Sequence, residues 1–327
     1  MNNEEILRKY KLTDFEHDKI YEEIKNIYID GKQPQEHPIT VIAGGQPGSG
    51  KSGLLGYSSK MFPDNNVIIL NSDEIKQFHP KNSEIARLHP DLYTPITGQE
   101  SDSWTSRLFE DLRKLNYNII FEIPMKNTRI VDGSIKELEA LGYTVIIRVL
   151  ATCDVESRIS ILERYEGQIQ SCGWGRLVVP ELHNAAYEGM PKTIDFIEQN
   201  GFYDILEVYT RGEDPTEPHL VYSQHNKSQK EKISAALEDK VKVSKIPNSF
   251  GYANAYDAIM SKRQEEYSTV IPRSKERLRG ILDSMKERNA SSIELEMTMD
   301  VFKLIEEKIE RDPSLCQRNQ DIEDMER

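Results

Sequence analysis

The sequence is poor in cysteine and has no long apolar run. Its three cysteines, Cys153, Cys172 and Cys316, are far apart and show no C-x-x-C spacing, which argues against a zinc site or a disulfide framework. No stretch approaches the ~18 apolar residues of a membrane span, and the first residues form no apolar signal segment. We therefore expect a soluble protein of the reducing cytoplasm, with no membrane partner.

Basic residues are also in deficit. The chain has 42 Lys and Arg against 55 Asp and Glu, so its formal net charge is −13. Nucleic-acid binding usually needs a basic face that displaces counterions, so this balance argues against a nucleic-acid partner. Hydrophobic residues make up only 37% of the chain and charged residues 30%. This composition fits a core domain with polar helical appendages.

Short apolar runs alternate with helical patterns in the middle of the chain. Strands are expected at residues 38–43, 67–70, 118–121, 144–150 and 205–209, with a further candidate at 219–223. Helical spacing separates them, at residues 51–60, 103–115, 131–141, 157–170 and 180–200. The alternation predicts an α/β fold with a mainly parallel, five-stranded sheet that has helices on both faces.

Both ends of the chain have a charged, helical texture. Apolar residues recur at helical spacing within residues 4–30, and the pattern after Gln224 is helical with interruptions at Gly251 and Pro272. We therefore expect a helical N-terminal extension at 1–36, an α/β domain at 37–224 and a separate helical C-terminal region at 225–327.

One motif, directly after the first predicted strand, carries specific chemistry. It consists of Gly45, Gln46, Pro47, Gly48, Ser49, Gly50, Lys51 and Ser52, and it fills every fixed position of G-x-x-x-x-G-K-[ST]. A helix is predicted after it, so backbone N–H groups can surround the phosphates of a nucleotide. Lys51 can bridge the β- and γ-phosphates, and the Ser52 hydroxyl can bind Mg²⁺. This P-loop motif predicts a site for ATP and Mg²⁺.

Two carboxylates follow neighbouring predicted strands, where an open parallel sheet binds its ligands. Asp73 follows the strand at 67–70, and Glu122 closes the strand at 118–121. Asp73 could accept a proton from a substrate hydroxyl or organise the water shell of a metal; alternatively it caps a short helix, a position that Ser72 could fill equally well. Glu122 could contact the substrate, or it could form a salt bridge at the strand end.

Two arginines belong to a predicted lid at residues 157–185. Arg164 lies in the helix expected at 157–170, and Arg176 follows a loop with two glycines. Phosphoryl transfer needs cations over the γ-phosphate, and a lid can bring them when the site closes. The alternative is that both are helix-surface arginines paired with neighbouring glutamates.

Taken together, four segments of the chain resemble the zeta toxins of bacteria. They are residues 44–52, 73–80, 117–122 and 163–166, followed at the family's spacing by Arg176, Pro180 and His183. The resemblance covers roughly residues 38–224 and implies an ATP-dependent kinase that phosphorylates a hydroxyl of UDP-N-acetylglucosamine.

The resemblance also implies a role for each candidate. Asp73 would be the base, and the last two residues of the P-loop motif would serve ATP and Mg²⁺. Arg164 and Arg176 would stabilise the transferring phosphate, while Glu122 would help to place the acceptor. Such toxins need an inhibitor. It could be an antitoxin protein, or the helical ends of this chain could act in cis; packing or oligomerisation is the alternative role of these ends.

The sequence departs from the family pattern at the predicted acceptor side. After the strand-end glutamate the family has a Gly-Thr-Gly stretch and an arginine, whereas Pro124 here offers neither a hydroxyl nor a backbone N–H. The family also has an acidic residue in the preceding helix, where the region of Thr105 and Ser106 offers only hydroxyls. A kinase of another hydroxyl, such as an antibiotic or another nucleotide, therefore stays an alternative, as does an ATP-binding regulatory module.

Overall fold

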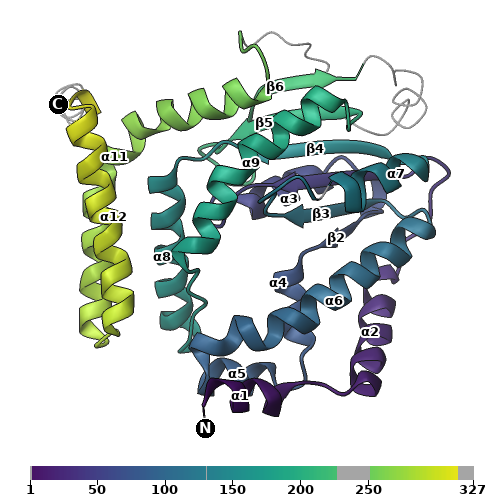
Figure 1. Ribbon diagram of the computed structural model, residues 1–327, viewed down its shortest axis with the longest axis horizontal. Coiled ribbons are helices and arrows are strands. Elements are labelled where there is room, and N and C mark those ends of the chain that lie inside the picture. The colour runs from purple at the N-terminus through teal and green to yellow at the C-terminus, as the bar shows by residue number, and fades with distance from the viewer. Residues whose placement is uncertain (1, 130, 227–250, 316–327) are drawn as a thin grey trace.

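A computed structural model describes residues 2–129, 131–226 and 251–315 (Figure 1). Residues 227–250 and 316–327 of the expected C-terminal region, Cys316 among them, lie outside the described residues. The described chain forms a six-stranded sheet in the order β2-β3-β1-β4-β5-β6. The strands are β1 (Ile39–Gly44), β2 (Ile68–Leu70), β3 (Ile119–Ile123), β4 (Thr144–Leu150), β5 (Ile205–Thr210) and β6 (His219–His225).

The predicted α/β class is confirmed, and the sheet contains the further candidate strand, β6, in addition to the five expected strands. All neighbouring strands run parallel except β6, which pairs antiparallel with β5. Residues 211–218 join these two strands directly. Because a parallel crossover needs about a dozen residues or more, so short a connection requires the chain to reverse its direction.

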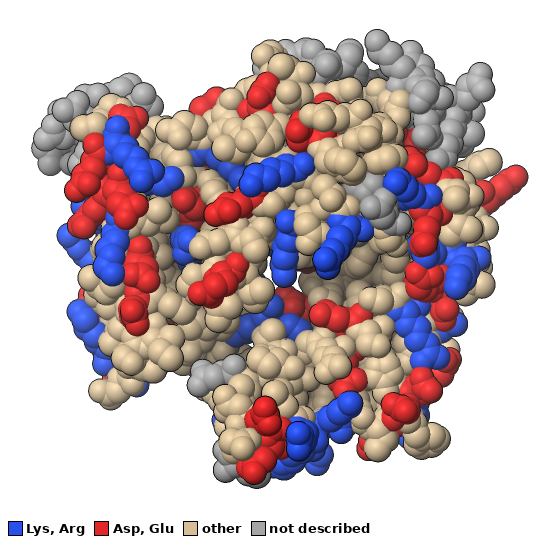
Figure 2. All heavy atoms as spheres, viewed as in Figure 1, with Lys and Arg blue, Asp and Glu red and all other residues tan. Residues whose placement is uncertain are grey.

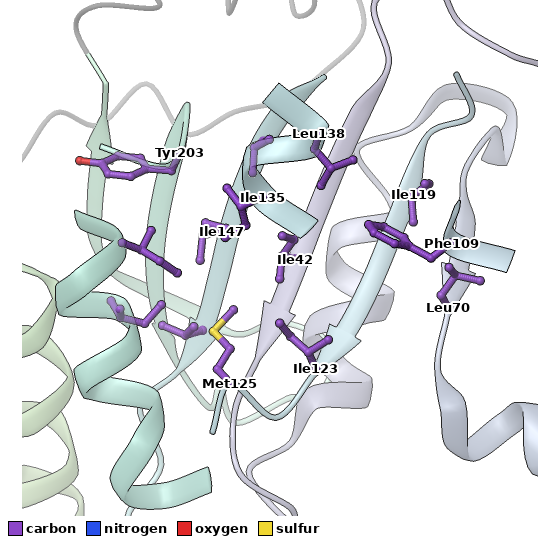
Figure 3. Packing of buried hydrophobic residues seen from close by; sticks show 14 of the residues in the cluster. Ile42, Leu70, Phe109, Ile119, Ile123, Met125, Ile135, Leu138, Ile147 and Tyr203 are labelled. Carbon is purple, nitrogen blue, oxygen red and sulfur yellow. The ribbon is translucent and has the colours of Figure 1, made fainter. Parts of the chain in front are cut away.

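Helices cover both faces of the sheet, and a cluster of buried residues lies on each face. On one face α3 (Lys51–Ser59) contributes Leu54 and Leu55 to a cluster with Val41 of β1. On the other face lie α6 (Tyr93–Lys114), α7 (Lys136–Ala140) and α9 (Pro180–Asn200). Figure 3 shows this second cluster, in which Ile42 and Ile147 of neighbouring strands pack with residues of the covering helices.

Shorter helices fill the connections between these elements. They are α4 (Ser72–Ile75), α5 (Asn82–Leu88), the 3₁₀ turns η1 (Pro63–Asn65), η2 (Lys76–Phe78) and η3 (Pro90–Leu92), and the π-helical segment η4 (Val131–Ile135).

The N-terminal extension consists of two helices, α1 (Asn3–Tyr10) and α2 (Asp14–Ile29). Each begins with a capping box, formed by Asn2 with Glu5 and by Thr13 with Glu16. Helix α2 buries Tyr21 and Ile24 in the cluster that includes α6. The extension therefore contributes to the core of the molecule.

The C-terminal region contains α11 (Ala255–Glu287) and α12 (Ser292–Arg311), which form a hairpin beside α8 (Asp154–Cys172) (Figure 1). A third cluster of buried residues joins α8, α11 and α12. The predicted interruption at Pro272 is wrong, because this proline lies inside α11. Proline removes one backbone donor from a helix, but buried residues on both sides of it, including Ile271 and Leu278, hold α11 against α8.

A buried ion pair links two central strands. Arg148 of β4 lies opposite Glu207 of β5 in the sheet, with 2.7 Å between Nε and Oε2. Their side chains are 3% and 0% exposed. The Arg148 guanidinium also donates to the Ser58 hydroxyl of α3 over 3.0 Å. The pair therefore ties the helix that follows the P-loop motif to the sheet.

Candidate active site

A cavity of about 790 Å³ lies where strands β1, β2 and β3 end. Six of the side chains singled out in the sequence line it, namely Lys51, Ser52, Asp73, Glu122, Arg164 and Arg176. Pro47, Gly48 and Gly50 line it as well, whereas Gly45, Gln46 and Ser49 are buried beneath it. The space-filling view shows a hollow in this face of the molecule with basic and acidic side chains around it (Figure 2).

The P-loop motif forms the turn between β1 and α3. Gly48 has φ +77°, and a Cβ at this position would clash with the carbonyl group of Ser157. Glycine is therefore required here by both conformation and space. Gly50 is the N-cap of α3, and no side chain caps this helix. The first N–H groups of the helix consequently lack a side-chain acceptor, as expected at an anion-binding helix N-terminus.

Lys51 and Glu122 form a partly buried pair at the floor of the cavity. The Lys51 Nζ lies 3.5 Å from the Glu122 Oε1, and it donates to the backbone carbonyl of Gln46 over 3.0 Å. Burial lowers the pKa of Lys51, although Glu122 opposes that shift. Burial likewise raises the pKa of Glu122, against the effect of Lys51. Glu122 thus forms the strand-end salt bridge considered for it and also lines the cavity, while its contact with a substrate stays a prediction.

Asp73 is held by two cations. Helix α4 begins at Ser72 and is capped by Asn71, whose side chain accepts from the Asp73 N–H over 2.9 Å. Neither Asp73 nor Ser72 is the cap, and the Asp73 carboxylate instead pairs with Arg176 and, over 2.9 Å, with Lys76. Burial alone would raise the pKa of Asp73, but Arg176 and Lys76 outweigh it and lower that pKa to about 2.

The two candidate arginines come from different elements. Arg164 lies on α8, and Arg176 lies in the segment that joins α8 to α9. Burial and the nearby Arg176 lower the pKa of Arg164, and no carboxylate of the described residues forms a salt bridge with it. The glutamates beside Arg164 have other partners, because Glu163 pairs with Arg277 and Glu166 with Arg288. Arg277 lies within α11, and Arg288 is the C-cap of that helix.

Sequence reasoning missed Arg211, which lines the cavity directly after β5. Its guanidinium donates to the backbone carbonyls of Gly48 and Ser49 and pairs with Glu156 of α8 over 2.7 Å. The rule that selected Asp73 and Glu122, a polar residue at the carboxyl end of a strand, would have found it.

Asp102 of α6 is a second omission. It lines the cavity together with Thr105 and Ser106, so the prediction that the region of these two residues offers only hydroxyls is wrong. Burial raises the pKa of Asp102, and Lys76 opposes that shift. The helix was expected to begin at residue 103, but it begins at Tyr93, and its additional turns bring the carboxylate to the cavity.

A parallel sheet whose first strand leads through G-x-x-x-x-G-K-S into an uncapped helix defines a P-loop nucleotide-binding fold. The sequence model of the Zeta toxin family matches residues 25–225, which is more than half of the chain. The chain therefore belongs to the zeta toxin family.

Individual relatives agree with this assignment. The chain is 27% identical to Toxin zeta of Enterococcus hirae over 186 residues, which cover 56% of this chain and 64% of that protein. It is 24% identical to Toxin PezT of Streptococcus pneumoniae over 182 residues, 55% of this chain and 72% of the relative. A solved structure from the PezAT chromosomal toxin-antitoxin system of Streptococcus pneumoniae has a similar fold, with a TM-score of 0.65 and 20% identity. That likeness covers 85% of this chain and 98% of the solved one.

No helix among the described residues is long and apolar enough to cross a membrane.

Proposed function

We propose that this protein is a kinase that transfers the γ-phosphoryl group of ATP to a hydroxyl of a nucleotide sugar such as UDP-N-acetylglucosamine. The observation that carries the proposal is the meeting of a P-loop lysine, a carboxylate and two arginines in one cavity. Phosphoryl transfer depends on positioning and on stabilising the charge of the transferring group, which these residue types supply. Family membership supports the same reaction class.

The phosphate side of the cavity fits ATP and Mg²⁺. The open N-terminus of α3 suits the β-phosphate, and Lys51 would exchange its contacts with Gln46 and Glu122 for phosphate oxygens. The Ser52 hydroxyl would bind Mg²⁺, which neutralises charge on the phosphates when it is bound. Arg164 and Arg176 would stabilise the charge that develops on the γ-phosphoryl oxygens.

Asp73 would be the general base. With a pKa of about 2 it is ionised but a weak base while Arg176 and Lys76 both hold it. A γ-phosphate attracts Arg176, and losing that partner would raise the pKa of Asp73 and make it a better base. The acceptor oxygen would then form a bond to the γ-phosphorus as the bond to the β-phosphate oxygen breaks. Asp73 would receive the hydroxyl proton, and ADP would leave.

The acceptor side differs from the family pattern in a way that favours a second candidate function. Pro124 and Lys126 line the cavity, and Pro124 has no N–H to donate to a sugar. Asp102, in contrast, supplies an acidic group in the preceding helix as the family pattern does, so it does not separate the two candidates. The departure at Pro124 alone therefore favours the second candidate, a kinase of a different hydroxyl compound that uses the same phosphate side.

A protein partner is part of the proposal. The similar solved structure belongs to a toxin–antitoxin system. We infer that uncontrolled phosphorylation by this protein harms its host and that an antitoxin protein, or the helical ends of the chain, restrains it. An ATP-binding regulatory module would bind ATP in the same cavity without transferring phosphate.

The proposal is tested by incubating the protein with ATP, Mg²⁺ and a panel of UDP-sugars and by following the acceptor mass. We expect one sugar to gain a single phosphoryl group. Lys51→Ala should abolish the gain, whereas Lys60→Ala, an exposed lysine just after the same helix, should not. Phosphorylation of another hydroxyl compound only would favour the second candidate. ATP binding with no transfer to any acceptor would favour the regulatory module and overturn the kinase.

A further inference from the structure

Arg263 is a buried arginine of α11 that reaches the underside of the P-loop motif. Its side chain is 2% exposed and lies over the ring of Tyr187, with 3.9 Å between Cζ and the ring centroid. Its Nη1 donates to the Tyr187 carbonyl over 2.8 Å, and its Nη2 donates to the Oε1 of Gln46 over 3.2 Å. The contact with Gln46 joins positions that are 217 residues apart in the sequence.

The surroundings of Arg263 are costly for a guanidinium. No carboxylate of the described residues forms a salt bridge with it, and its Nε has no hydrogen-bond partner. Burial lowers its pKa, which reflects the same cost to the charged form. An apolar side chain of similar length would avoid this cost, but it would leave the Tyr187 carbonyl and the Gln46 Oε1 without a donor. What the arginine specifically supplies at this position is the pair of donated hydrogen bonds, one of them to Gln46 of the P-loop motif.

The contact with Gln46 determines the orientation of an amide. A guanidinium can only donate, so the Gln46 oxygen must face Arg263 and the NH₂ group must face the other way. There the Nε2 donates to the Thr152 carbonyl over 2.7 Å and to the Ser157 hydroxyl over 3.3 Å. If the Gln46 amide were reversed, its NH₂ group would face the Arg263 guanidinium, which is also a donor. Its oxygen would then face the Thr152 carbonyl oxygen, which is also an acceptor. Arg263 thus selects one arrangement of Gln46.

Gln46 in turn is connected to the phosphate-binding groups. Its backbone carbonyl accepts from the Lys51 Nζ over 3.0 Å and from the Ser49 N–H over 3.1 Å. Gln46 is fully buried, so its side chain supports the loop from below while Lys51 faces the cavity. A change in the orientation of the Gln46 side chain should therefore alter the position of the loop backbone.

We propose that Arg263 is a positioning residue for the phosphate-binding loop, acting through the side chain of Gln46. Helix α11 is then part of the nucleotide-binding machinery, although it lies in the helical C-terminal region. The inference rests on the proposed function in one respect, that the ligand of the loop is ATP. It concerns binding of the nucleotide, and it does not depend on which hydroxyl accepts the phosphate.

The test compares stability with nucleotide affinity in Arg263→Met. Methionine fills a similar volume but leaves the Tyr187 carbonyl and the Gln46 Oε1 without their donor, so we expect the chain to fold with a melting temperature lowered by several degrees. The affinity for ATP with Mg²⁺, measured by calorimetry on the full chain, should fall about tenfold or more, as for loss of a hydrogen bond to a charged group. Arg273→Met, at an exposed position of the same helix, is the matched control and should leave affinity unchanged.

A double-mutant cycle assigns the effect to Gln46. Gln46→Met alone should also weaken ATP binding, and combining it with Arg263→Met should add little, because both changes remove the same contact. If Arg263→Met does not fold, the affinity of Gln46→Met, which leaves α11 intact, decides the question. Wild-type affinity in a stable single variant, or fully additive losses, would overturn the proposal. ATP binding by wild type without any transfer would overturn only the kinase; a wild type that binds no ATP would overturn both.

Discussion

The two helical ends of the chain have similar compositions but pack against different walls of the cavity. At the N-terminal end, α2 packs on α6, the helix that carries Asp102. At the C-terminal end, α11 packs on α8 and α9 and reaches Gln46. The N-terminal end therefore supports the side of the cavity proposed for the acceptor, and the C-terminal end supports the side proposed for ATP. Changes at the N-terminal end should consequently alter the binding of the acceptor, and changes at the C-terminal end should alter the binding of ATP.

Removing each helical end separately should give the largest effects. A chain that ends at Gln224 loses α11 and α12 and uncovers Val155, Ile159 and Leu162 of α8. Each exposed side chain costs about 1.5–3 kcal/mol, so the total approaches the ~5–15 kcal/mol that stabilises a whole domain. We expect no cooperative unfolding transition and no phosphoryl transfer from this chain, as measured by calorimetry and initial rates.

A chain that begins at His37 should be less affected. It uncovers the α6 surface that Tyr21 and Ile24 cover, so it should melt earlier but keep its affinity for ATP. The same pair of shortened chains tests the division at residue 225, which stays a prediction. A stable chain ending at Gln224 with full activity would show that the C-terminal helices are separable. A higher rate from the chain beginning at His37 would support inhibition in cis.

Asp73 lies between the two walls of the cavity. Its replacement should change neither the affinity for ATP nor the affinity for the acceptor. Asp73→Asn keeps the shape of the side chain but cannot accept a proton, so turnover should fall by about 10²–10⁴. The affinity for ATP, measured by calorimetry, should change little. A parallel loss of ATP affinity would show that Asp73 binds the metal or stabilises the fold. Asp64→Asn, at an exposed position, is the control.

The arginines of the phosphate side should show a smaller effect. Arg164→Lys and Arg176→Lys keep a charge but not the planar fork that contacts two phosphate oxygens. We expect each to lower turnover about tenfold or more, equivalent to about 1.4 kcal/mol of transition-state stabilisation, with a smaller change in the KM for ATP. Arg279→Lys, at an exposed position of α11, is the control. Full turnover in either site variant would show that its arginine is not required for transfer.

The smallest expected effect concerns the N-terminal end. The Tyr21 hydroxyl donates to Asp111 of α6 over 2.6 Å, and Tyr21→Phe removes this bond at a cost of about 1 kcal/mol. The KM for the acceptor should rise by less than about fivefold, and the KM for ATP should not change. Tyr28→Phe is the control, because no bond of its hydroxyl is found among the described residues. A rise in the KM for ATP alone would contradict the division of roles between the two ends.

The parallel part of the fold was predictable because its strands are β-branched, apolar runs that are buried on both faces. The P-loop motif was predictable for a similar reason, since its glycines have a local steric role. The start of α6 was not predicted, and the turns missed contain Pro95 and Gly98, two residues that form helices poorly. Proline is tolerated in the first turn of a helix, where its missing N–H has no partner in any case. Asp102 was therefore overlooked.

The supporting contacts could not be predicted from the sequence. Arg263 and Arg277 occur in a stretch with many charges, and nothing in its spacing distinguishes a buried arginine from a solvated one. Their partners, Gln46 and Glu156, lie 217 and 121 residues away. Such pairings depend on how α11 packs against α8 and α9, so only the tertiary structure reveals them.

The buried pair of Arg148 and Glu207 couples the stability effects of substitutions at two distant sequence positions. Losing either residue alone leaves an uncompensated buried charge, which costs about 3–5 kcal/mol, more than most single substitutions. Replacing both by apolar residues of similar volume is often nearly neutral. Related chains should accordingly retain both residues or neither, and a lineage that exchanges them must pass through a destabilised intermediate unless the second change follows quickly.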